Sequence, residues 1–187
     1  FTLGQVGVRQ DKGTWSTASD VWMIGSPVLV TESPYGYFAA GKVGSPGNSY
    51  STIVQRIDYG NDTATGVEKG PLDWGREYCN GLSNRSYGYV IGGAETSRVD
   101  RMDYSSDTTK MVEKGPLTAA KYQLGTAGTN DYGYAAGGVD ITPNPKVLNS
   151  IIDRIDYSND TATALVKGSL SASRASFHGA GNKDYGY

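Results

Sequence analysis

Hydrophobic and polar residues alternate with a period of two along several short stretches of the chain. In residues 53–59, for example, Ile53, Gln55, Ile57 and Tyr59 share one face, as expected for a β-strand. Clusters of Gly, Asn, Asp and Ser bound these stretches, and such residues favour turns through local hydrogen bonds and tolerance of positive φ. No segment shows a convincing hydrophobic period of 3.6 residues. The pattern therefore predicts an all-β chain of short strands.

The same pattern repeats along the chain, and three markers recur in phase at intervals that include 45 and 53 residues. The markers are Tyr-Gly-Tyr at 35–37, 87–89, 132–134 and 185–187, Arg-(Ile/Met)-Asp-Tyr at 56–59, 101–104 and 154–157, and Lys-Gly-(Pro/Ser)-Leu at 69–72, 114–117 and 167–170. Differences in length fall between the glycines that follow Tyr-Gly-Tyr and the next Arg-x-Asp-Tyr. That stretch is therefore predicted to be a variable loop.

Each repeat unit predicts four strands. One strand carries Tyr-Gly-Tyr and ends at a glycine pair, and the next carries Arg-x-Asp-Tyr and ends in a polar turn. A third strand stops at Lys-Gly-Pro-Leu, because proline cannot donate a hydrogen bond to a sheet. The last strand runs from about Arg76, Lys121 or Arg174 to the turn before the next Tyr-Gly-Tyr.

Together these markers resemble the kelch repeat, whose units of about 50 residues each form one blade of a β-propeller. The resemblance implies about four units of four-stranded antiparallel sheet, either a complete propeller or part of a larger one. The units are residues 1–37, which form a degenerate or partial repeat, and residues 38–89, 90–134 and 135–187. The residues that carry the resemblance are Gly41, Gly92, Gly93, Gly137, Gly138, Asp58, Tyr59, Asp103, Tyr104, Asp156 and Tyr157.

The amino-acid sequence of the repeat is also similar to kelch-like repeats in structural and tail-fibre proteins of tailed phages of aquatic bacteria. The similar motifs are Tyr-Gly-Tyr-x-x-Gly-Gly and Arg-Ile-Asp-Tyr-Ser-Asn-Asp-Thr. This second resemblance implies a virion or extracellular location.

Composition excludes several kinds of function. With one Cys and one His among 187 residues, the chain cannot form an internal disulfide or a thiolate or histidine metal site. No run of about 18 apolar residues occurs, so we expect no membrane insertion. The net charge of −2 gives no indication of nucleic-acid binding. We therefore expect no cofactor, no nucleic acid and no membrane among the partners.

Three arginines recur at one position of the repeat, Arg56, Arg101 and Arg154. They could together clamp an anion, since a guanidinium binds a carboxylate through two hydrogen bonds. Alternatively, each ties adjacent strands by pairing with the Asp two residues later, Arg56 with Asp58 for example. The Asp recurs with the Arg, which favours the structural role. The turns that follow lack the ligand density and the closing Glu of a calcium loop, so no metal is predicted.

The variable loops are the predicted recognition surface, because a rigid scaffold commonly carries its binding residues on loops. The candidate binding residues are Lys42, Tyr50, Trp74, Asn144 and Lys146. The aromatic ones could stack on sugars or on partner side chains, and they could equally serve the core.

The absence of a catalytic cluster favours a non-catalytic structural or adhesion module, in a phage tail fibre or another extracellular filament, that is not an enzyme. Its partners would be other copies, other structural proteins of the assembly or a cell-surface glycan. The alternatives are a carbohydrate-active, sialidase-like propeller enzyme and an intracellular kelch module that binds proteins. Because a Tyr-Gly-Tyr marker closes the chain at 185–187, we expect either an excerpt of a longer protein or units completed by a partner copy.

Overall fold

The computed structural model describes residues 34–43, 49–93, 96–142, 145–182 and 184–187, and the regular elements in these ranges are β-strands and one-turn 3-10 helices. The strands are β1 (Tyr35–Ala39), β2 (Lys42–Val43), β3 (Ser49–Tyr50), β4 (Val54–Asp58), β5 (Val67–Glu68), β6 (Asn80–Ser83), β7 (Tyr87–Ile91), β8 (Val99–Asp103), β9 (Val112–Glu113), β10 (Lys121–Tyr122), β11 (Gly125–Gly128), β12 (Tyr132–Ala136), β13 (Val139–Asp140), β14 (Val147–Leu148), β15 (Ile151–Asp156) and β16 (Leu165–Ser169). The 3-10 helices are η2 (Tyr59–Asn61), η3 (Tyr104–Ser106) and η4 (Tyr157–Asn159). Most of the predicted first unit, 1–37, lies outside the described residues.

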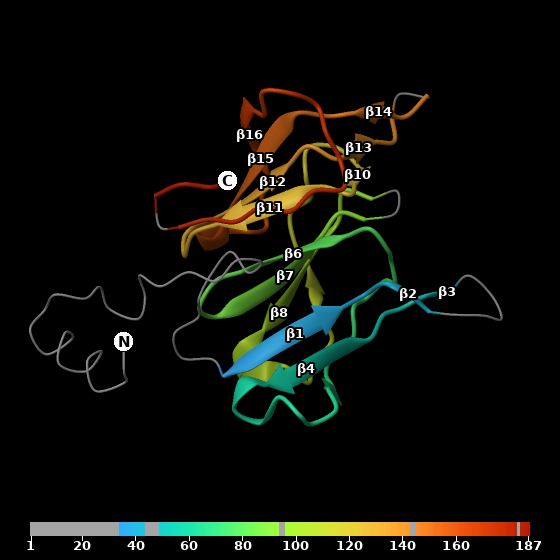
Figure 1. Cartoon of the computed structure of the whole chain (residues 1–187), viewed down its shortest axis with the longest axis vertical. Helices are drawn as coiled ribbons and strands as arrows, with labels where there is room; N and C mark the ends of the chain where they lie inside the picture. Colours follow the sequence, from blue (N-terminus) through green and yellow to red (C-terminus); the bar gives the residue numbers. More distant parts are fainter. Residues whose placement is uncertain (1–33, 44–48, 94–95, 143–144, 183) are drawn as a thin grey trace, which may run out of the picture.

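The longer strands form three antiparallel sheets, which we call blades A, B and C. Blade A has the strand order β1-β4-β5, blade B β6-β7-β8-β9 and blade C β11-β12-β15-β16. Figure 1 shows the three blades following one another from the lower to the upper part of the molecule. This up-and-down order is that of a propeller blade, and it confirms the all-β propeller fold predicted from the sequence.

In blades B and C, the Tyr-Gly-Tyr strand is the second strand of the sheet. In blade B, Tyr89 of β7 lies opposite Leu82 of β6 on one side and opposite Arg101 of β8 on the other. The strand that the sequence places at the end of one repeat therefore joins the sheet of the next. As a result, the sheets of blades B and C begin at β6 and β11 rather than at residues 90 and 135.

In each blade, the strand that pairs with the Tyr-Gly-Tyr strand and carries Arg-x-Asp-Tyr ends at an aspartate that caps a 3-10 helix. Asp58 Oδ1 accepts a hydrogen bond from the backbone N–H of Gly60 at 2.8 Å. Asp103 and Asp156 accept the equivalent bonds in the other two blades. The polar turns that the sequence predicts are therefore built by contacts between residues two apart, which is why the local pattern is sufficient to find them.

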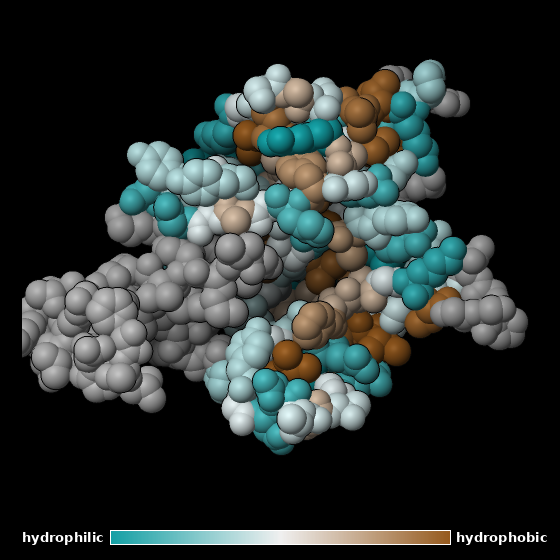
Figure 2. Space-filling view, viewed as in Figure 1, coloured by the Kyte–Doolittle hydropathy of each residue, from teal (hydrophilic) through white to brown (hydrophobic). Residues whose placement is uncertain are grey.

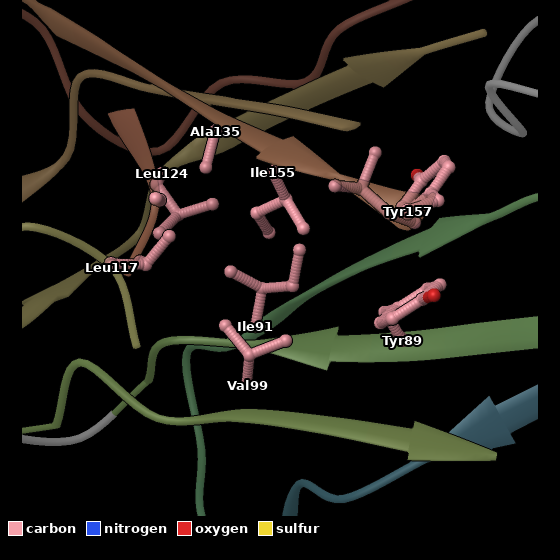
Figure 3. Close-up of a cluster of buried hydrophobic side chains, with 10 residues drawn as sticks. Tyr89, Ile91, Val99, Leu117, Leu124, Ala135, Ile155 and Tyr157 are labelled. Atoms are coloured by element: carbon pink, nitrogen blue, oxygen red, sulfur yellow. The ribbon is translucent and has the colours of Figure 1, made fainter. Parts of the chain in front are cut away.

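The apolar core lies between the blades. At the junction of blades B and C, Ile155 and Tyr157 point towards Tyr89, Ile91 and Val99 of the preceding blade (Figure 3). The rings of Tyr89 and Tyr157 stack with their centroids 4.8 Å apart. Full burial of one such aliphatic side chain stabilises by about 2 kcal/mol. A second cluster joins blades A and B and consists of Val54, Leu72, Val90, Met102 and Met111.

Close packing between blades requires glycine at specific positions. The pair at 92–93 has φ angles of +59° and +105°, a region that glycine enters without a steric penalty, and the chain turns out of β7 there. At Gly70 and Gly115, an added Cβ would lie 1.8 and 1.9 Å from the carbonyl oxygens of Thr109 and Ala162 in the next blade. Part of the glycine surplus therefore reflects contacts between blades.

The stretches predicted as variable loops form small sheets. Strand β2 pairs with β3, and β10, β13 and β14 form a three-stranded sheet. Residues with high β propensity, such as Val139 and Val147, make this pairing favourable. Figure 1 shows both small sheets at the same end of the blades.

Candidate functional site

The small sheets mark one end of the propeller, which we call the hairpin end and define by β2, β3, β10, β13 and β14. Backbone hydrogen bonds tie this end together across blades. The N–H of Gly41 donates to the carbonyl of Arg76 at 2.9 Å, and the N–H of Gly93 donates to the carbonyl of Lys121 at 3.2 Å. Each glycine that ends a second strand is thus fixed against the segment leading into the next blade.

Three residues at one position of the repeat near this end adopt a left-handed conformation although none is glycine, as does Ala40 after β1. Tyr78, Gln123 and Ser176 have φ angles of 57°, 56° and 57°. This conformation costs about 1 kcal/mol per residue, and its recurrence shows that the fold imposes it. The N–H of Gln123 donates to the carbonyl of Tyr78, and the N–H of Ser176 donates to that of Gln123, both at 2.9 Å. The three residues therefore follow one another from blade to blade just before the first strands, which surround the axis of a propeller.

Tyr78 and Tyr122 form an aromatic pair beside this ladder. Their ring centroids are 5.9 Å apart with the planes tilted by 42°. The Tyr78 side chain is 52% exposed, and Tyr122 is half-buried. The Nζ of Lys146 lies 5.2 Å from the centroid of the Tyr122 ring. We call Tyr78, Tyr122 and Lys146 the aromatic site, since it places an exposed ring surface next to a cation.

Further aromatic residues lie at the outer part of the hairpin end. Tyr50 is 45% exposed and Trp74 is 50% exposed. Lys42 lies opposite Tyr50 in the β2–β3 pair. A Cβ at Gly75 would lie 2.3 Å from the carbonyl oxygen of Tyr50, so the chain next to Trp74 runs directly against β3. Figure 2 shows apolar surface over β14 and beside β2 and β3, mixed with hydrophilic residues.

Of the loop residues predicted to bind a ligand, the structure places Lys42, Tyr50, Trp74 and Lys146 in exposed positions, whereas Asn144 lies outside the described residues. It brings Lys146 to the Tyr122 ring and Lys42 to Tyr50. Tyr78 was not among the residues predicted from the sequence. The one available signal was that an aromatic residue stands there where the aligned units have Gln123 and Ser176.

The residues of the repeat signature serve the scaffold. The glycines at 41, 92, 93, 137 and 138 have positive φ, and Asp58, Asp103 and Asp156 cap the 3-10 helices. Tyr104 and Tyr157 pack at the two junctions between blades, against Tyr37 and Tyr89. Tyr59, in contrast, is 55% exposed on blade A.

The repeated arginines pair with aspartates of the next blade. Nη1 of Arg56 lies 2.8 Å from Oδ2 of Asp107, and Nη1 of Arg101 lies 2.8 Å from Oδ2 of Asp160. The prediction that Arg56 pairs with Asp58 is wrong, because the Asp58 carboxylate already caps its own turn. These two guanidinium groups are held at separate junctions, so they do not form a common anion clamp.

A charged network covers the hairpin-end side of blades A and B. Arg98 forms ion pairs with Asp73, Asp100 and Glu113 at 2.7, 2.9 and 2.8 Å. Hydrogen bonds from Lys110 and Arg98 lower the pKa of Asp73 below its ordinary value. These charges offset one another within the network. Lys146, in contrast, lies over the Tyr122 ring at the aromatic site.

Clustered metal ligands are absent from the described part of the chain: no group of three or more His, Cys, Asp or Glu side chains in those ranges could hold a metal ion. No helix found there is long and apolar enough to span a bilayer.

The chain was compared with known proteins. No protein-family model matches the sequence, and no curated protein is similar to it. Among solved structures, the one titled "Structure of YjhT" superposes with a TM-score of 0.59 at 15% sequence identity. The match covers 70% of this chain and 42% of that chain, so this chain spans less than half the length of YjhT. The likeness establishes the fold.

This match corrects one prediction. The sequence suggested that the chain is not an enzyme, because it lacks a His or Cys cluster. The likeness to YjhT points against that exclusion, because it shows a propeller scaffold, and a fold does not by itself decide whether a protein is an enzyme. Sialidases use a tyrosine nucleophile, so a low content of His and Cys does not exclude this class of chemistry.

Proposed function

We propose that the chain is part of a carbohydrate-binding propeller that engages an acidic glycan at the aromatic site. The observation that carries the proposal is the exposed Tyr78–Tyr122 pair, with its rings 5.9 Å apart and Lys146 at one edge. The site lies where the chain enters the first strands of the blades, and the backbone ladder through Gln123 holds it in place.

The chemistry of these side chains suits a sugar with a carboxylate. The face of a tyrosine ring carries partial negative charge and attracts the C–H groups on the apolar face of a sugar. A lysine ammonium provides three hydrogen-bond donors and a positive charge. An acidic sugar stacked on Tyr122 would therefore present its carboxylate to Lys146. Tyr50 and Trp74 would contact neighbouring sugars of a longer glycan.

A sialidase-like activity is the catalytic form of this proposal. It is supported by the fold shared with YjhT and by the use of tyrosine as the nucleophile in sialidases. Either Tyr78 or Tyr122 would supply the hydroxyl. The cation for the substrate carboxylate would be Lys146, whose Nζ lies 5.2 Å from the centroid of the Tyr122 ring.

The assignment to the kelch repeat, and a virion or extracellular location, belong to the same proposal. The repeated Tyr-Gly-Tyr and Asp-Tyr motifs of the sequence support both the assignment and the location. In that setting, the partners would be a cell-surface glycan and other proteins of the assembly.

Titration calorimetry with sialyllactose and with lactose tests the proposal. We expect sialyllactose to bind more tightly, and we expect Tyr122→Ala to weaken binding by about tenfold or more through loss of the stacking surface. Lys146→Ala should bring the two affinities together. Val112→Ala is the control, because Val112 is a similarly exposed apolar side chain on β9 that belongs to neither the aromatic site nor its surroundings. Absence of binding to both sugars, or unchanged binding by Tyr122→Ala, would refute the proposal.

Hydrolysis of a fluorogenic aryl α-sialoside separates binding from catalysis. Release of the fluorophore that is lost in Tyr78→Phe or Tyr122→Phe, with binding retained, would support the sialidase-like form. Binding without release would restrict the function to recognition.

A further inference from the structure

The two complete junctions between blades follow one design. At the first, Asp107 of blade B accepts a hydrogen bond from the Tyr37 hydroxyl at 2.9 Å and pairs with Arg56 and Lys69 of blade A at 2.8 and 3.2 Å. The backbone N–H of Gly70 donates to the carbonyl of the same aspartate at 2.8 Å.

The second junction repeats these contacts one blade later. Asp160 of blade C accepts a hydrogen bond from the Tyr89 hydroxyl at 3.1 Å and forms ion pairs with Arg101 at 2.8 Å and Lys114 at 3.3 Å. The backbone N–H of Gly115 donates to the carbonyl of Asp160 at 2.7 Å. Each blade thus offers a Tyr, an Arg, a Lys and a Gly to one aspartate of the blade that follows.

Blade C carries the same four residue types, but in the described chain no aspartate of a following blade pairs with them. The aligned residues are Tyr134, Arg154, Lys167 and Gly168. The Nε of Arg154 is buried and has no hydrogen-bond partner in the described chain. A Cβ at Gly168 would meet nothing within 4 Å, whereas at Gly115 it would lie 1.9 Å from a carbonyl oxygen.

An apolar groove of about 270 Å³ lies beside this set. Its lining includes Tyr134, Ala136, Ile152, Leu170 and Phe177. These positions align with Tyr89, Ile91, Val99, Leu117 and Leu124, which receive Ile155 and Tyr157 at the junction of blades B and C (Figure 3). Residues of the C-terminal segment, Asn182 and 185–187 among them, form the other side of the groove.

Blade A carries the complementary set on its other face. Asp62 aligns with Asp107 and Asp160. It is exposed, and no described residue pairs with it, while the two aligned aspartates are buried. Phe38 and Tyr59 align with Ala135 and Tyr157 of the B–C core, and they are 63% and 55% exposed.

We propose that these two faces bind each other between two copies of the chain. Asp62 of a second copy would meet Tyr134, Arg154 and Lys167, and Phe38 and Tyr59 of that copy would fill the groove. Gln55 of the second copy would accept a hydrogen bond from Arg174, as Asp100 does from Arg76. Because each copy would offer both faces, the reciprocal contact closes a ring of two chains.

Residues 185–187 lie where β1 of the second copy would sit. They pair with residues 180–182 through short hydrogen bonds between Ala180 and Tyr187, at 2.9 and 2.7 Å. Both segments read Tyr-Gly-Tyr, so residues 35–37 of the second copy can replace 185–187 by exchanging identical side chains. Tyr185 and Tyr187 are among the most exposed aromatic side chains of the described chain, so their displacement uncovers little additional apolar surface.

Sedimentation velocity of the 187-residue chain over a wide concentration range tests the proposal. We expect a species of twice the 19.9 kDa chain mass. Asp62→Arg and Arg154→Glu should each weaken association by about tenfold or more, because like charges then face each other. An equimolar mixture of the two variants should associate again. In the mixed pair, the introduced arginine faces the introduced glutamate at one contact, and the native aspartate faces the native arginine at the other. Recovery in the mixture also shows that both variants fold.

Two matched controls separate this contact from other causes. Asp131→Arg and Arg85→Glu make the same charge changes at exposed positions outside the two faces and should leave association unchanged. Gly168→Ala should keep the thermal stability of the monomer but prevent association, because the new methyl group would meet a carbonyl oxygen of the second copy. A chain that stays at 19.9 kDa at every concentration, or variants that associate like the parent chain, would overturn the proposal.

Discussion

Arg56 and Asp107 belong to different blades, and Nη1 of the arginine lies 2.8 Å from Oδ2 of the aspartate. The aspartate stands in the turn that follows the third strand of blade B, where Lys69 and Tyr37 also reach it. Arg101 and Asp160 repeat this relationship at the next junction. The repeated polar residues of the sequence therefore hold one blade to the next, and the stability of the array depends on them.

Removing the charge of Asp160 should destabilise the protein. In Asp160→Asn, the amide cannot neutralise Arg101 and Lys114, and both cations are largely buried. We expect a loss of about 2 kcal/mol or more in the free energy of unfolding, measured by urea denaturation. Glu68→Gln, at an exposed position, is the control and should change stability by less than about 0.5 kcal/mol. Equal effects of the two substitutions would contradict the role given to Asp160.

The junction glycines provide a matched pair of substitutions. Gly115→Ala places a methyl group 1.9 Å from the carbonyl oxygen of Ala162, and backbone atoms on both sides must move. We expect destabilisation of at least about 2 kcal/mol in thermal unfolding. Gly168→Ala occupies the aligned position with nothing within 4 Å, so in dilute solution it should be neutral. Similar losses for both variants would show that the close approach at Gly115 is not the cause.

A fully buried ion pair joins blade C to the segment before β11. Nζ of Lys121 lies 2.9 Å from Oδ2 of Asp153, and both side chains are completely shielded from solvent. Lys121→Met leaves a buried carboxylate without its cation, which should cost about 3–5 kcal/mol in chemical denaturation. Adding Asp153→Leu should recover most of that loss, because the double variant buries no charge. If the double variant is as unstable as the single one, the loss reflects packing rather than charge.

Acid should weaken the junction between blades A and B. Burial by itself raises the pKa of Asp107, but the hydrogen bonds from Tyr37 and Lys69 and the charge of Arg56 outweigh it, so the pKa lies below its ordinary value. The carboxylate therefore stabilises the fold above the unfolded pKa of about 3.9, and this contribution is lost as the pH falls through the lower, folded pKa. Urea denaturation at decreasing pH should show the difference between the parent chain and Asp107→Asn shrinking in that window. A constant difference would contradict this assignment.

High pH should lower the stability of the fold by ionising the Tyr37 phenol. Burial, together with the hydrogen bond to Asp107 and the charge of that carboxylate, raises the pKa of Tyr37 to about 12. The neutral phenol thus contributes stability that is complete below the unfolded pKa of about 10 and is lost as the pH rises through about 12. Absorbance of tyrosinate should show a component near this pH that is missing in Tyr37→Phe. Loss of that component without any change in alkaline stability would separate the titration from the junction.

The strands and turns of this protein could be predicted because their causes are local. Alternation in residues 53–59 places side chains on the two faces of β4, and Asp58 caps the following turn through a residue two positions away. The spacing of the markers also predicted successive blades, since each unit supplies the same strands. The hairpin end could be expected as a surface from the variable lengths of its loops.

The partners of the charged and aromatic residues were decided only by the tertiary structure. The sequence paired Arg56 with Asp58, yet its ion pair is with Asp107, which is 51 positions away. Tyr78 and Lys146 meet at Tyr122 in the same way, from separate segments brought together at the hairpin end. Coulombic and stacking interactions depend on distances in space, and those distances are set by how one blade packs on the next.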